Sequence, residues 1–209
     1  MAQSQNKKTL ALVVALILSA CAGSQDAVTN GPVPDPTKPV IGDPNAKGTI
    51  GIRNHNELRG ALYAMMGFSA SVTAVDTFLT TNRQTFSGAG FVSGVTPEEI
   101  QKRVEANFTA CTAGVANPGQ ATVLGPLLAG WNLNVGPGGV SNALITSYSS
   151  GLWQVATGEK VIPSDVLNSI IQFVPSFTTG AANTAATTKS LAASICAAIL
   201  SSPKALAVM

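Results

Sequence analysis

The sequence is poor in charge and in histidine. Only 11% of its 209 residues are Asp, Glu, Lys or Arg, and His55 is the sole histidine. Soluble domains usually carry about 25% charged residues. His55 has no second histidine or cysteine near it in sequence, so no close pair of metal ligands is present. We expect neither a metal nor a cofactor.

Motifs that mark common catalytic sites are also missing. No serine lies in Gly-x-Ser-x-Gly, and no glycine-rich stretch ends in Gly-Lys-Ser/Thr. Ser201 and Lys204 have the spacing of Ser-x-x-Lys, but Pro203 would break the helical turn that brings them together. Glu98 and Glu99 suit the first turn of a helix and need no catalytic explanation. We predict that the protein is not an enzyme.

The balance of charge excludes a basic surface on the mature protein. Twelve Lys and Arg face ten Asp and Glu, and two of the twelve are Lys7 and Lys8 near the N-terminus. Without that segment, ten Lys and Arg balance ten Asp and Glu, and the sequence predicts no basic surface for binding nucleic acid. A protein with few charged residues and no net charge tends to associate with other protein molecules. Exported proteins are also often rich in Ser, Thr and Asn, and both interpretations stay open.

The N-terminal segment is typical of a secretory signal peptide. Lys7 and Lys8 precede an apolar run from Leu10 to Leu18, and small residues follow it. The run is about half as long as the roughly 20 residues that a membrane-spanning helix needs. We therefore expect residues 1–20 to be cleaved.

The four residues Leu18-Ser19-Ala20-Cys21 at the end of this segment resemble the lipobox of bacterial lipoproteins. The resemblance implies that the Cys21 thiol carries a diacylglycerol, that cleavage precedes Cys21, and that palmitate or a similar acyl chain is added to its amine. Two or three acyl chains anchor a protein stably. The resemblance also implies a location in the cell envelope. Ala22, in place of aspartate, favours the outer membrane, with the domain facing the periplasm or the cell surface.

Residues 21–50 are predicted to form a lipidated, disordered tether. Five prolines lie between Pro32 and Pro44, and no large apolar cluster accompanies them. Proline lacks the backbone donor that helices and central strands need. About 29 residues would average roughly 30 Å as a coil and reach some 90 Å when extended. The folded domain, residues 51–209, can therefore stand away from the bilayer.

Two cysteines remain once Cys21 carries lipid. Cys111 and Cys196 form an even pair, and such a pair usually bridges in an oxidising compartment. The bridge would close a loop of 85 residues. Two buried free thiols are the alternative.

The folded domain is predicted to be all-α, with six or seven helices in an orthogonal or bundle-like arrangement. Apolar residues recur at helical spacing, and no convincing alternation of period two is present. Thr96-Pro97-Glu98-Glu99 is typical of a helix start. The predicted helices fall weakly into two groups of three, one ending near Cys111 and the other near Cys196. The expected segments are about 54–66, 71–84, 96–111, 141–156, 164–175 and 181–200, with a broken helix near 121–129. We expect Gly67 to end the first of these helices and Ser164 to cap the one that begins there. Val155 is expected to point inward from segment 141–156, and segment 181–200 is expected to carry one apolar stripe.

Two tryptophans are candidates for contacts with a partner. Trp153 follows Leu152 on a predicted helix and is expected in the core, whereas Trp131 lies in a predicted loop and is expected at the surface. The favoured function is a membrane-anchored accessory or structural module that docks on an envelope protein or self-associates. The alternative is a periplasmic binding protein for an apolar ligand or lipid, with a cavity lined by four residues: Met65, Met66, Phe78 and Phe108.

Overall fold

The computed structural model describes residues 51–52, 55–86, 90–91 and 97–208. The predicted signal peptide, Cys21 and the predicted tether lie outside the described residues. Within them the regular structure is helical apart from an isolated bridge between Phe68 and Ala121 and one pair of two-residue strands, in which β1 (Gly51–Ile52) runs antiparallel to β2 (Gly90–Phe91). The all-α prediction is confirmed.

Six longer helices and two short ones make up the described domain. The longer helices are α2 (His55–Met66), α3 (Thr73–Thr81), α4 (Pro97–Ala116), α6 (Asn142–Thr157), α7 (Ser164–Thr178) and α8 (Ala185–Leu200). The short ones are α5 (Leu124–Leu127) and α9 (Pro203–Val208), and a single 3-10 turn, η1, spans Pro137–Gly139. The short α5 occupies the place of the predicted broken helix.

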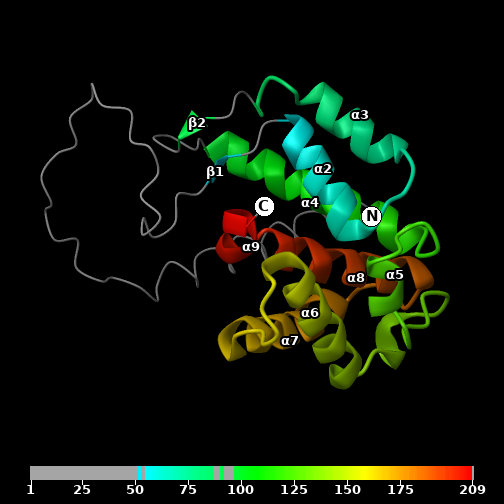
Figure 1. Ribbon diagram of the computed structural model, residues 1–209. Coiled ribbons are helices and arrows are strands. Elements are labelled where there is room, and N and C mark those ends of the chain that lie inside the picture. Colours follow the sequence, from blue (N-terminus) through cyan, green and yellow to red (C-terminus); the bar gives the residue numbers. More distant parts are fainter. Residues whose placement is uncertain (1–50, 53–54, 87–89, 92–96, 209) are drawn as a thin grey trace, which may run out of the picture.

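The centre of the domain is the pair α4 and α8, which pack against each other more extensively than any other two elements. Helices α2 and α3 cover α4 on one side, and α6 and α7 pack beside α8 on the other (Figure 1). The first group is therefore α2, α3 and α4, and the second is α6, α7 and α8. This division follows the two groups that the sequence suggests.

Helix α8 is buried on all its faces over most of its length. Every residue from Leu191 to Leu200 is buried. Alanine, serine and cysteine alternate there with larger aliphatic residues, so neighbouring helices can approach closely on several sides. The predicted apolar stripe on one face is too narrow a description, because a helix that is surrounded by neighbours has no solvent face.

Several helix ends differ from the predictions. The last long helix begins at Ala185 rather than near 181, where the Thr184 side chain accepts a hydrogen bond from the Thr187 backbone N–H. Ser164 was predicted to cap α7, but it is the first helical residue and Pro163 occupies the cap position. Gly67 does end α2 as predicted: its φ is +73° and its N–H donates to the Tyr63 carbonyl at 2.9 Å.

The buried face of α6 is also rotated from the prediction. Val155 was expected to point inward, but it is 37% exposed. The buried positions centre instead on Ser149, Leu152 and Ala156, with Trp153 beside them. Val155 lies at the edge of this face, about 95° from its centre at 100° per residue. Trp153 is in the core, as predicted.

Candidate functional site

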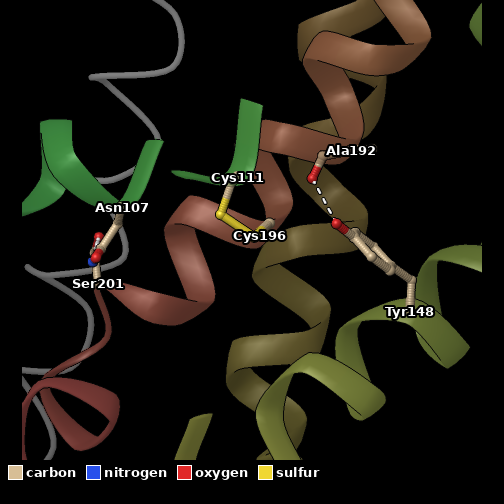
Figure 2. Close-up of a disulfide and its surroundings, with 6 residues drawn as sticks. All are labelled: Asn107, Cys111, Tyr148, Ala192, Cys196 and Ser201. Atoms are coloured by element: carbon tan, nitrogen blue, oxygen red, sulfur yellow. Dashed lines mark hydrogen bonds between the residues drawn. A yellow bond between two sulfur atoms is a disulfide. The ribbon is translucent and has the colours of Figure 1, made fainter. Parts of the chain in front are cut away.

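Cys111 and Cys196 form the predicted disulfide. The bond joins α4 to α8 with the two Cα atoms 5.9 Å apart, and both side chains are fully buried (Figure 2). It therefore links the two helix groups at their main contact. Disulfides of this kind persist in oxidising compartments.

Two buried hydrogen bonds flank the disulfide. The Asn107 side-chain amide donates to the Ser201 hydroxyl at 3.0 Å, and the Tyr148 hydroxyl donates to the Ala192 carbonyl at 3.2 Å (Figure 2). Burial raises the pKa of the Tyr148 hydroxyl well above its usual range. Because these groups are all buried, this part of the core is built for stability rather than for contact with a ligand.

Ser201 and Lys204 do not form a nucleophile and base. The Ser201 hydroxyl is buried against Asn107, while the Lys204 amine pairs with Glu159. Glu99 is similarly engaged in an ion pair with Arg103, at 2.8 Å along α4. Thr96, its predicted capping partner, lies outside the described residues.

His55 opens α2 and contacts its neighbour rather than an acidic group. Its Nδ1 lies 3.1 Å from the Asn56 side-chain oxygen, and its Nε2 is buried without a hydrogen-bond partner. Within the described part of the chain, no three His, Cys, Asp or Glu side chains come together as a metal site would require.

Trp131 lies in the loop after α5, but the exposure expected for it is wrong. The side chain is only 8% exposed, because its ring packs on the buried Tyr148 ring with the centroids 5.2 Å apart. Its indole N–H has no hydrogen-bond partner. The ring borders a wide, open cavity of about 550 Å³ that also reaches Leu128, Asn134 and Lys189. A partner contact at Trp131 stays a prediction.

A polar cluster ties α2 to α3 at the surface. The Arg59 guanidinium donates to both Asp76 carboxylate oxygens, at 2.7 and 3.2 Å, and the Tyr63 hydroxyl donates to one of them at 2.9 Å. The Val72 backbone N–H donates in turn to the Tyr63 hydroxyl at 2.7 Å.

The electrostatics of this cluster follow from these bonds. The hydrogen bond from Arg59 lowers the pKa of the Asp76 carboxyl, and burial raises the pKa of the Tyr63 hydroxyl. Near neutral pH, Asp76 is therefore ionised and Tyr63 is neutral. These are the forms that make the hydrogen bonds between α2 and α3.

Helix α7 carries an apolar face that the domain covers only in part. Ile170 and Phe177 are buried, whereas five further apolar side chains on the helix pack against the core but are only partly buried. Val161, just before the helix, is 76% exposed. The five partly exposed residues of this α7 face are Val166, Leu167, Ile171, Phe173 and Val174.

A second cavity, which we call the α7 cavity, lies beneath one end of this face. Its volume is about 150 Å³, and its walls come from α6, α7, α8 and the start of α9. Sequence reasoning missed both the α7 face and the α7 cavity. The helical spacing of apolar residues in α7 was visible, but a sequence does not show which of them the neighbouring helices leave uncovered.

The described residues contain no helix that combines the length and the hydropathy needed to cross a bilayer. Comparison with known proteins adds no relative: the chain matches no protein-family model, no curated protein and no solved structure.

Proposed function

We propose that this chain is an exported lipoprotein without enzymatic activity, whose helical domain docks on a protein partner in the cell envelope. The observation that carries the docking role is the partly covered apolar face of α7, continued by the exposed Val161. Contiguous apolar patches that remain accessible at a protein surface mark interaction sites more often than isolated exposed apolar residues do.

The chemistry of the α7 face favours a protein over a membrane surface. The helix contains Asp165 and no Lys or Arg. Helices that lie on membranes usually carry many cations on their polar face. An uncharged apolar face bordered by Asn168 and Gln172 suits the apolar surface of another protein or of a second copy of the chain.

Export and anchoring rest on the sequence and on the disulfide. The signal segment and the lipobox-like residues ending in Cys21 support lipidation, with the outer membrane as the proposed location. The buried Cys111–Cys196 bond supports an oxidising compartment. The anchor would hold the domain at the membrane, while the tether leaves the α7 face free to reach a partner.

Site-specific photocrosslinking in the native cell tests the docking role. A photoreactive side chain at Leu167 or Ile171 should give one crosslinked product, whereas the same group at Asn168, on the polar side of α7, should give little. Equal crosslinking from all three positions, or none from any, would contradict the proposed docking face. Sequencing the product distinguishes another envelope protein from a second copy.

Metabolic labelling with palmitate tests the anchor separately. The wild-type protein should incorporate the label and fractionate with membranes, and Cys21→Ala should do neither. A labelled Cys21→Ala protein would exclude Cys21 as the lipidated residue, without bearing on the α7 face.

A further inference from the structure

The α7 cavity is lined by side chains from four helices and is partly open to solvent. Trp153 on α6, Val166 and Ile170 on α7, and Ala198 and Ile199 on α8 form its inner wall. Its outer edge is formed by Ser202 and by the exposed Pro203 and Lys204 at the start of α9. Almost all of the surface that these walls present to the cavity belongs to carbon atoms. The lining alone therefore favours an apolar occupant.

The few polar groups at the cavity already have partners. The Trp153 indole N–H donates to a Glu159 carboxylate oxygen at 3.3 Å, and the Lys204 amine pairs with the other oxygen of the same carboxylate. The Ser202 hydroxyl accepts from the Ala205 backbone N–H at 3.3 Å. A polar ligand, or a water molecule that needs two or more partners, would find few groups here that are not already engaged.

The volume of the cavity limits the size of a ligand that could bind there. Its volume is about 150 Å³. A closed cavity of about this volume with aliphatic and aromatic walls takes up benzene or xenon. The α7 cavity has a similar volume and similar walls but opens to solvent beside Pro203 and Lys204, which gives a ligand a way in. We propose that the α7 cavity binds one neutral apolar group of about six carbon atoms, either a small aromatic molecule or the end of an acyl chain. This proposal does not depend on the docking role of the α7 face, although Val166 belongs to both the face and the cavity wall.

Nuclear magnetic resonance of methyl groups tests the proposal on the wild-type protein. Titration with benzene should shift the methyl signals of Val166, Ile170 and Ile199 in a saturable way. The methyl signals of Leu58 and Leu62, in the core of the first helix group, should stay unchanged. The absence of saturable shifts at the three cavity residues would overturn the proposal.

Variants that fill the cavity supply the second test. Ala198→Leu from α8 and Val166→Phe from α7 each place extra carbon atoms in the space, so both should abolish the saturable shifts. Ala186→Leu, on an exposed position of α8, is the matched control and should bind as the wild type does. If one of the two filling variants fails to fold, the other still tests whether benzene binds in the cavity. Undiminished binding in a folded filling variant would overturn the proposal.

Competition experiments distinguish the two candidate ligands, a small aromatic molecule and the end of an acyl chain. Decanoate that displaces benzene from the α7 cavity would identify the end of an acyl chain as an accepted ligand. Benzene binding that decanoate does not disturb would support small aromatic molecules. Displacement of benzene by hexanol and hexane with equal strength would support an apolar site without a polar subsite, whereas a strong preference for the alcohol would contradict it.

Discussion

The two helix groups are stabilised by different kinds of contact. In the first group, ion pairs add to the packing: Arg59 and Asp76 link α2 to α3 at the surface, and two further pairs lie along α4. One of these, Arg103 with Glu99, is largely buried. In the second group, α6 and α7 pack around α8, whose residues from Leu191 to Leu200 are all buried. Both groups have a buried apolar core. The first adds several ion pairs to it, whereas the second adds close packing of small residues along α8.

The few ion pairs of the domain are distributed unevenly between the two helix groups. Among the described residues, three of the four ion pairs belong to the first group, and the remaining one joins Lys204 to Glu159 at the edge of the second. The α7 face and the α7 cavity both lie in the second group. The group with fewer ion pairs thus carries the proposed binding functions.

Loss of the disulfide should have the largest effect on stability. The double variant Cys111→Ala/Cys196→Ala releases an 85-residue loop, so its free energy of unfolding should fall by about 4 kcal/mol in urea denaturation. Reduction of the wild-type protein should produce a similar fall. Hydrogen exchange should then show α2 and α3 losing protection before α8, because their ties are solvent-accessible. Loss of protection in α8 first would contradict the comparison.

Enlarging a small residue in α8 should have the next largest effect. Ala197→Leu adds carbon atoms at a fully buried position and should lower the free energy of unfolding by about 1–3 kcal/mol. The same substitution at Ala64, an exposed position of α2, should change it by less than about 0.5 kcal/mol. Urea denaturation of the two variants measures both. Equal effects would show that α8 is less tightly packed than its burial indicates.

The sequence predicts the helices and the disulfide well, because both depend on local or pairwise signals. Apolar spacing marks the helical segments, and an even pair of cysteines after a predicted export signal marks the bridge. Exposure is predicted less well. Trp131 is buried because Tyr148, from a different helix, lies against it. Val155 is exposed because the buried face of α6 is centred elsewhere. Burial depends on which helices become neighbours, and the order of residues along the chain does not state that.

The tie between α2 and α3 should have the smallest effect, and the effect should depend on pH. At pH 7, Asp76→Asn should lower the free energy of unfolding by about 0.5–1 kcal/mol, because the Arg59–Asp76 pair is partly exposed. The pKa of Asp76 is lower in the folded state than in the unfolded chain, where it is about 3.9. The contribution of Asp76 is therefore present above the unfolded pKa and is lost as the pH falls through the folded pKa.

The difference between Asp76→Asn and wild type should consequently shrink as urea denaturation is repeated from pH 7 towards pH 3. Glu105→Gln is the matched control, since Glu105 pairs with Lys102 only one helical turn away. It should change stability by a few tenths of a kcal/mol at most, as isolated pairs on a helix surface do. A pH-independent loss in Asp76→Asn would mean that the Tyr63 hydrogen bond, and not the charge of Asp76, holds α3 on α2. The first helix group would then resemble the second in depending on uncharged contacts.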